Sequence, residues 1–118
     1  MANNLVMYSR TFGCPFISLA KRVLSDHAVT YREIMIDKDS SAKQRVLDWT
    51  GFLSVPTIIV AADGEDLPVE PPTSLEPGTS PRGVDRGTMI TEPNIEELLT
   101  FLKRHGFVEQ ADAQLDAF

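Results

Sequence analysis

Cys14 stands where a helix is expected to begin, and a cysteine in that place can act as a nucleophile. The residue after it, Pro15, suits the first position of a helix, where a missing N–H group costs nothing. The helix dipole and the free N–H groups of the first turn stabilise an anion there, so the thiolate form of Cys14 is favoured. Arg10, four residues earlier, adds a positive charge. The pattern predicts a reactive thiol, and the alternative is a buried, inert cysteine.

A second feature is the pair Val55-Pro56, which opens the apolar run 55–60. Only bonds that precede proline adopt the cis form readily. A cis bond here would expose the backbone of Val55, whose N–H and C=O groups could pair with an extended peptide as an added strand does. The alternative is an ordinary trans proline at the start of a strand.

Three segments that could position these residues repeat apolar side chains at intervals of three and four, as amphipathic helices do. Pro15 opens the first, and Asn94 with Glu97 has the spacing of a capping box at the last. The second is expected to begin at a cap on Ser40 or Ser41 and to run to about Thr50, and the last to begin at Thr91 or Asn94 and to stop at Gly106. The expected buried faces are Phe16, Leu19, Ala20, Val23 and Leu24; then Ala42, Val46 and either Leu47 or Trp49; then Ile95, Leu98, Leu99 and Leu102.

Four short apolar runs are expected to form strands, at residues 5–8, 31–37, 55–60 and 87–90. The resulting order is β-α-β-α-β-β-α. A strand, a helix and a second strand in succession imply a right-handed crossover between parallel strands. The last two strands most simply form an antiparallel hairpin. We therefore predict an α/β fold in which helices cover a small mixed sheet.

Residues 63–86 interrupt this pattern with five prolines, six acidic and two basic side chains. We expect an irregular loop inserted between the last two strands. A loop of this length either is a tolerated surface insertion or binds a partner. The prediction is one domain over residues 1–108, followed by a flexible polar tail at 109–118.

The composition excludes several classes of function. The 118 residues suit one domain, and the net charge of −6 argues against nucleic-acid binding, which needs a basic surface. The single cysteine excludes an intramolecular disulfide and a cysteine-rich metal site, and the two histidines lie at separate helix ends, so no metal site is expected. No apolar run reaches membrane-spanning length, and no secretion signal opens the sequence. We expect a cytoplasmic monomer without a membrane partner.

Two segments resemble the glutaredoxin family. Residues 8–17, YSRTFGCPFI, are similar to its active-site segment, and residues 50–57, TGFLSVPT, are similar to its Thr-Gly-x-x-(Thr/Ser)-Val-Pro segment. Both lie in the family's order, and the resemblance covers about residues 5–107 apart from 63–86. It implies a thioredoxin-like fold, a β-α-β-α-β-β-α three-layer sandwich with a four-stranded mixed sheet.

The resemblance also implies site residues. Cys14 would be the nucleophile, Pro56 the cis-proline beside it, and Val55 the residue whose backbone pairs with the cysteinyl unit of glutathione. The other implied glutathione contacts are Arg10 and Lys43 for the glycine carboxylate, Phe16 next to the nucleophile, and Thr91 and Glu92, at the start of the last helix, for the γ-glutamyl end. The alternatives are solvated surface charges at Arg10 and Lys43, and a first-turn helix acid at Glu92.

Departures from the family pattern narrow the implied reaction. Dithiol members have Cys-Pro-Tyr-Cys, whereas residues 14–17 read Cys-Pro-Phe-Ile and no second cysteine exists to resolve a disulfide. Iron–sulfur members show Cys-Gly-Phe-Ser and a Trp-Pro pair, and this chain has neither. Gly13 is an extra residue before the nucleophile, and residues 89–91 replace the usual Gly-Gly.

Three hypotheses follow. The first is a glutathione-dependent monothiol oxidoreductase that reduces glutathione mixed disulfides through Cys14, with glutathione as co-substrate and glutathionylated proteins as partners. The second is a carrier in which two chains and two glutathiones hold a [2Fe–2S] cluster through Cys14. The third is a non-catalytic module that binds a partner through residues 63–86. The sequence names neither the physiological substrate nor the low-molecular-weight thiol.

Overall fold

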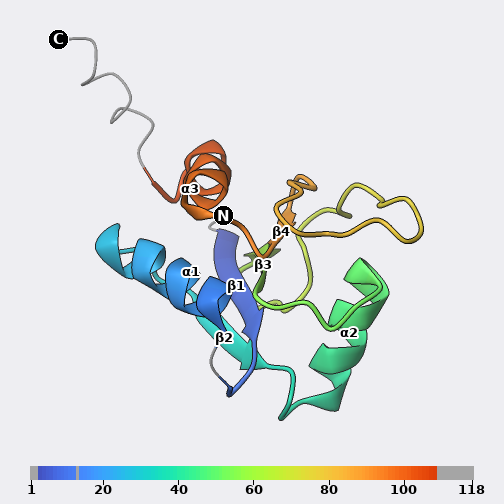
Figure 1. Cartoon of the computed structure of the whole chain (residues 1–118). Coiled ribbons are helices and arrows are strands. Elements are labelled where there is room, and N and C mark those ends of the chain that lie inside the picture. The colour runs from blue at the N-terminus through green and yellow to red at the C-terminus, as the bar shows by residue number, and fades with distance from the viewer. Residues whose placement is uncertain (1–2, 13, 109–118) are drawn as a thin grey trace, which may run out of the picture.

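The part of the chain that the structure describes forms four strands and three helices, in the order predicted (Figure 1). The computed structural model describes residues 3–12 and 14–108. Gly13 and the expected tail at 109–118 lie outside the described residues. The elements are β1 (Asn3–Ser9), α1 (Pro15–Asp26), β2 (Arg32–Met35), α2 (Ser40–Thr50), β3 (Thr57–Ala62), β4 (Met89–Thr91) and α3 (Ile95–Arg104).

The strands form one mixed sheet in the order β2-β1-β3-β4. The predicted parallel pair is confirmed between β1 and β2, where Val6 lies opposite Arg32. β3 runs antiparallel to β1, with Tyr8 opposite Thr57, and the predicted hairpin is confirmed by the antiparallel pairing of β3 with β4. This pairing places the end of β1 beside the start of β3, with Tyr8 opposite Thr57, and Cys14 contacts Val55 just before β3.

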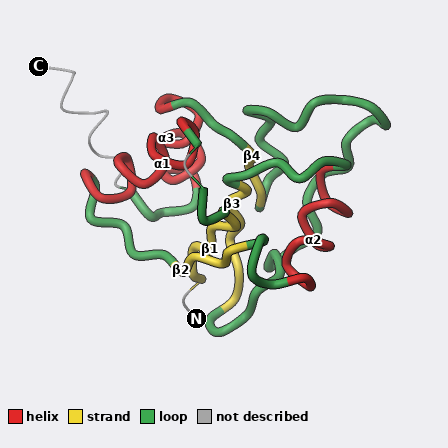
Figure 2. Tube along the Cα trace, turned by 60° about the horizontal axis from the view of Figure 1, so that its bottom comes forward, coloured by secondary structure: helices red, strands yellow, loops and turns green. Residues whose placement is uncertain are grey.

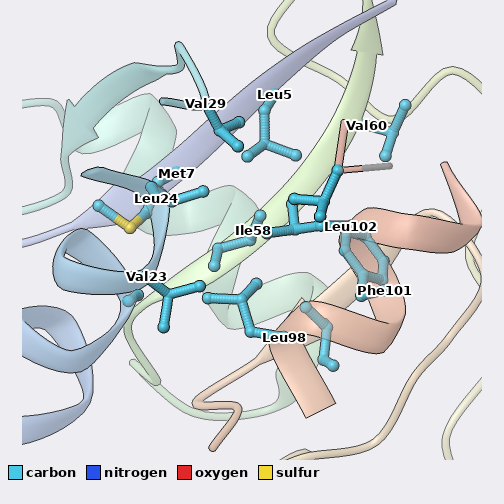
Figure 3. Packing of buried hydrophobic residues seen from close by; sticks show 13 residues of the cluster. Leu5, Met7, Val23, Leu24, Val29, Ile58, Val60, Leu98, Phe101 and Leu102 are labelled. Atoms are coloured by element: carbon cyan, nitrogen blue, oxygen red, sulfur yellow. The ribbon is translucent and has the colours of Figure 1, made fainter. Parts of the chain in front are cut away.

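Helices cover both faces of the sheet, which gives a three-layer α/β sandwich. Leu5 and Met7 of β1 pack toward α1 and α3, whereas Val6 and Tyr8 pack toward α2. A strand buried on both faces is apolar along its whole length rather than at every second residue. Figure 3 shows the first of these interfaces, whose buried side chains include Val23, Leu24, Val29, Ile58, Val60, Leu98, Phe101 and Leu102 besides those of β1.

Two of the expected buried faces are wrong in detail. In α3, Leu98, Phe101 and Leu102 fill the interface, while Ile95 is 47% exposed. Leu98, Phe101 and Leu102 share one side of the helix at spacings of three and four, and Ile95 lies on the flank of that side. In α1, Ile17 is buried and Phe16 is only partly covered.

One expected helix start is corrected, and at another the structure decides between the two predicted alternatives. Asp39, rather than Ser40 or Ser41, caps α2, because its carboxylate accepts a hydrogen bond from the Ala42 amide at 3.1 Å. Thr91 belongs to β4, and α3 begins after Asn94. The predicted capping box at α3 is confirmed, with both reciprocal bonds between Asn94 and Glu97 at 2.8 Å.

Residues 63–86, called here the irregular segment, contain no helix or strand and make only isolated β-bridges to β3 and β4. In Figure 2 they form part of the long green path between β3 and β4, which passes close to one end of α2. None of the helices in the described ranges is both long and apolar enough for a membrane crossing.

Candidate functional site

Cys14 is the N-cap of α1, with extended backbone angles of −153° and 131°, and Pro15 follows at the first helical position. The helical placement predicted for this thiol is confirmed. Its carbonyl accepts the first helical hydrogen bond, from the Ser18 amide at 3.0 Å. The side chain is partly buried, and the Sγ thiol donates to the Val55 carbonyl oxygen at 3.8 Å. The thiol therefore lies between the positive end of a helix and the start of β3.

The peptide bond between Val55 and Pro56 is cis, as the resemblance implied. Both residues are buried, and the Pro56 carbonyl accepts a hydrogen bond from the Glu92 amide at 2.8 Å. Thr57, the next residue, bonds through its hydroxyl to the Ser54 carbonyl at 2.9 Å. These contacts hold the Val55 carbonyl in place against Cys14.

A groove of about 310 Å³ opens beside the thiol, and we call it the thiol groove. A smaller hollow of about 160 Å³ adjoins it, since Arg10 and Leu53 line both. Lys43, with Ile36 and Asp37, lines only the smaller hollow. The other residues that line the thiol groove are Cys14, Phe52, Ser54, Val55, Ser80, Pro81, Arg82 and Glu92.

The structure brings some of the expected glutathione contacts together. Arg10 and Lys43 are exposed cations that share the smaller hollow, and Arg10 also reaches the thiol groove with Cys14 and Val55. Hydrogen bonds from Thr11 lower the pKa of Asp37, the acid of the smaller hollow. Its carboxylate therefore stays ionised beside the two cations, so an incoming anion meets one net positive charge there.

Other expected contacts are placed differently. Phe16 is not among the residues that line the groove, and its ring lies under the Arg82 guanidinium, 4.9 Å from the ring centroid. Pro56 and Thr91 are buried and line neither hollow. The Thr91 hydroxyl is already bonded to that of Thr57, at 3.0 Å.

The expectation that Thr91 and Glu92 stand at the start of the last helix is wrong. The helix begins three residues after Glu92, and its first-turn acids are Glu96 and Glu97, so the first-turn interpretation of Glu92 fails as well. Glu92 adopts a positive φ of 46°, and its carboxylate lies in the thiol groove, 3.5 Å from the Nε of Arg82. The chain turns at Glu92 because its amide bonds to the Pro56 carbonyl rather than to a helical partner.

Sequence reasoning missed Arg82, which the irregular segment brings to the thiol groove. It also missed Phe52 and Leu53, which line the groove and are nearly half exposed. The signal for Arg82 was weak: it is one of two basic residues in a segment with six acidic ones. The described residues contain no group of three or more histidine, cysteine or acidic side chains arranged to hold a metal ion.

Comparison with known proteins gives consistent matches. The family model described as Glutaredoxin matches residues 5–65. The chloroplastic glutaredoxin-C4 of Oryza sativa subsp. japonica is 37% identical over 59 residues, which cover 48% of this chain and 44% of that protein. The chain thus spans less than half the length of this curated relative.

Two solved structures are also similar. One is a complex of buckwheat glutaredoxin with glutathione, 30% identical, with a TM-score of 0.42 over 49% of this chain and 55% of that one. The other is the holo form of glutaredoxin C1 from Populus tremula x tremuloides, 17% identical, with a TM-score of 0.47 over 85% of this chain and 74% of that one. The family-model match ends before Arg82 and Glu92.

Proposed function

Because this chain belongs to the glutaredoxin family, we propose that it is a glutathione-dependent thiol–disulfide oxidoreductase that works with one cysteine. The observation that carries the proposal is the position of Cys14, at the N-terminus of α1 and against the Val55 carbonyl, on the wall of an open groove. Thiol–disulfide exchange requires a cysteine sulfur that a disulfide can reach, and this position gives that access.

The reaction has two exchange steps. The Cys14 thiolate attacks the glutathione sulfur of a mixed disulfide; the S–S bond breaks, and the released substrate thiolate takes a proton from solvent. The enzyme now carries glutathione on Cys14. A second glutathione, as thiolate, attacks the glutathione sulfur of this adduct and forms glutathione disulfide, which returns the Cys14 thiolate. The net reaction consumes a mixed disulfide and one glutathione, and produces a substrate thiol and glutathione disulfide.

The groove residues have separate roles in this proposal. Cys14 is the nucleophile at the start of α1, and the backbone of Val55 pairs with the cysteinyl unit of glutathione. Arg10 and Lys43, which share the smaller hollow, attract its glycine carboxylate. A single-cysteine cycle is proposed because the sequence has no second cysteine to displace the glutathione.

Turnover of a glutathionylated peptide with excess glutathione tests the proposal. Wild type should release the peptide thiol with multiple turnovers, and Cys14→Ser should fall to the uncatalysed rate. Ser25→Ala, which changes an exposed hydroxyl on α1, serves as the control and should match wild type. Activity retained in Cys14→Ser, or no activity in wild type, would overturn the proposal.

Mass spectrometry tests the monothiol step separately. Wild type treated with glutathione disulfide should gain one glutathione per chain and lose it when glutathione is added. A [2Fe–2S] carrier would instead need ligands from outside this chain, since Cys14 is its one thiol. Colour after reconstitution with iron, sulfide and glutathione, together with a lack of turnover, would support the carrier hypothesis in place of the oxidoreductase.

A further inference from the structure

A second groove, of about 410 Å³, lies beside the thiol groove. It is lined by residues 48–52 at the C-terminal end of α2, by residues 74–79 of the irregular segment, and by Arg86. In Figure 2 the path between β3 and β4 passes close to this end of α2. Phe52 lines both grooves and is 47% exposed. The two grooves therefore meet at Phe52, and a ligand too large for one of them can extend into the other.

Hydrogen bonds hold the two walls of the second groove in position. Arg86 is 6% exposed and joins the walls, because its guanidinium donates to the Trp49 carbonyl of α2 and to the Thr73 carbonyl of the segment, each at 2.6 Å. Residues 76–79 form a turn in which the last amide donates to the first carbonyl at 3.0 Å. Gly78 has a φ of +83° in this turn, a conformation that favours glycine. The shape of the second groove is therefore a feature of the fold.

The two grooves differ in charge. Asp48 on α2 and Glu76 on the irregular segment are exposed acids, one on each wall of the second groove. Neither makes an ion pair in the part of the chain that the structure describes. Arg86, the cation of this groove, is buried and bonds to backbone carbonyls. The thiol groove instead carries two arginines and one acid. The second groove therefore presents negative charge to solvent, and the thiol groove presents net positive charge.

A mixed disulfide between glutathione and a protein has two parts that these grooves could hold separately. Glutathione carries two carboxylates and one ammonium group, so its net charge is negative and complements the thiol groove. The polypeptide part is attached at the reacting sulfur and has to continue outside the thiol groove. The second groove begins at Phe52, within reach of a chain that leaves the thiol groove on that side. Its two carboxylates favour a polypeptide of positive charge.

We propose that the second groove binds the polypeptide of the glutathionylated substrate and selects a lysine or arginine side chain near the modified cysteine. The identification of this polypeptide as a substrate rests on the proposed function. Asp48 and Glu76 bind the cationic group, and the exposed ring of Phe52 contacts its alkyl stem. An acidic or an apolar polypeptide is the alternative occupant, and the test includes both.

Three glutathionylated peptides test the proposal. They share one cysteine in an otherwise neutral sequence and carry lysine, glutamate or leucine on both sides of it. The kcat/KM for release of the peptide thiol is measured with excess glutathione. Asp48→Asn and Glu76→Gln each remove one charge from the second groove, and the asparagine keeps an acceptor for Gln44, which bonds to Asp48 at 2.8 Å. Glu65→Gln is the matched control, since Glu65 is an exposed acid of the same segment outside both grooves.

Wild type should favour the lysine peptide over the glutamate peptide by about 3- to 10-fold, the range expected for exposed charge pairs. Asp48→Asn and Glu76→Gln should each lower this ratio, and the double variant should bring it to about one or below. Glu65→Gln should leave the ratio unchanged. Added salt should lower the ratio in wild type, because exposed charges are screened. A general loss of structure would slow all three peptides together and would not remove the ratio selectively.

Trp49 provides a measurement that does not depend on turnover. It is the one tryptophan of the sequence and lines the second groove, so its indole NMR signal reports binding there. In a Cys14→Ser background, the lysine peptide without glutathione should shift this signal on titration, and the glutamate peptide should not. Asp48→Asn and Glu76→Gln should each weaken the binding of the lysine peptide, whereas Glu65→Gln should not.

The outcomes separate this inference from the proposed function. Turnover with a ratio that neither groove variant changes, or with a preference for the glutamate or leucine peptide, would overturn the selection and leave the oxidoreductase intact. Absent turnover of all three peptides, with lysine-peptide binding at Trp49 that the two variants weaken, would overturn the oxidoreductase and support the second groove as a site for basic polypeptides. Absent turnover together with an unchanged Trp49 signal would overturn both.

Discussion

The sheet and its helices are held together by apolar side chains buried on both faces, whereas the irregular segment is attached mainly through hydrogen bonds and ion pairs, several of them made by arginines. Leu67, Val69 and Val84 of the segment are all more than one-third exposed, so these three side chains contribute little burial. Arg86, near its end, is 6% exposed. The two regions meet at the thiol groove, which takes Cys14 from the first region and Arg82 from the second.

Arg86 is the inner anchor of the segment. Its Nε donates to the Thr73 carbonyl and its Nη1 to the Trp49 carbonyl, each at 2.6 Å. Burial lowers the pKa of this guanidinium, which remains charged at any physiological pH. The bond to Trp49 joins the segment to α2, so one side chain links parts of the chain that are 37 residues apart.

Arg104 of α3 is the outer anchor. It pairs with both carboxylate oxygens of Asp85, at 2.5 and 2.8 Å, and donates to the Gly87 carbonyl at 2.6 Å. A segment rich in proline and acidic residues is thus positioned by a few directional bonds rather than by burial. The two walls of the thiol groove therefore depend on different forces, and these forces can be disrupted separately.

The largest effect is expected from the core. Leu98→Ala removes a fully buried side chain between the sheet and α3 and should lower the free energy of unfolding by about 2–5 kcal/mol. Ile95→Ala, an aliphatic residue in the first turn of the same helix with 47% exposure, is the matched control and should cost less than about 1 kcal/mol. Urea denaturation measures both. Equal losses would show that the exposed flank of α3 matters as much as the interface.

Arg86→Met is expected to cause an intermediate loss of stability that is confined to the irregular segment. The variant leaves the Thr73 and Trp49 carbonyls without their donor, which costs about 1–3 kcal/mol. Hydrogen exchange should accelerate in residues 70–86 while amides of β1 and β3 keep their protection, because the core does not depend on this anchor. Arg22→Met controls for the loss of an arginine. Uniform acceleration through the sheet would mean that the two regions unfold as one unit.

Asp85→Asn is expected to cause the smallest loss of stability. Burial acts to raise the pKa of Asp85, but hydrogen bonds from Arg104 and Gly87 outweigh it, so this pKa is lowered on folding. A lowered carboxyl pKa adds stability above the unfolded value of about 3.9 and loses it as the pH falls through the folded value. Both side chains are roughly one-third exposed or more, so solvent screening limits the loss at pH 7 to at most about 1 kcal/mol.

The stability of Asp85→Asn should also depend on pH and on salt. The stability difference between wild type and Asp85→Asn should shrink below about pH 4 and should also decrease with added salt. Glu76→Gln, an exposed acid of the same segment, should show neither trend. A difference that persists at low pH would mean that the Asp85 side chain acts through packing rather than through its charge. Thermal denaturation across the pH range gives the measurement.

Local features of the sequence were sufficient to predict the helices and strands. They also predicted the side of the thiol groove that carries Cys14. Pro15 after Cys14 placed the thiol at a helix start, and Asn94 with Glu97 placed the start of α3, because caps depend on residues within one turn. At residues 39–41, three neighbouring side chains could cap α2. The prediction of Ser40 or Ser41 was wrong, because Asp39 is the cap. The order of strands and helices followed from the spacing of apolar side chains along the sequence. A strand that is covered on both faces needs a continuous apolar run, whatever its neighbours in space are.

The side of the thiol groove that carries Arg82 and Glu92 depends on contacts between residues that are distant in the sequence. Arg82 meets Glu92 and Phe16, and Arg86 meets Trp49, only after the irregular segment has folded against the sheet. No period or cap marks these residues, because the free energy of a directional bond depends on where its partner lies in space. The composition of residues 63–86 therefore indicated an acidic loop, whereas its folded form presents one of its two arginines to the thiol groove.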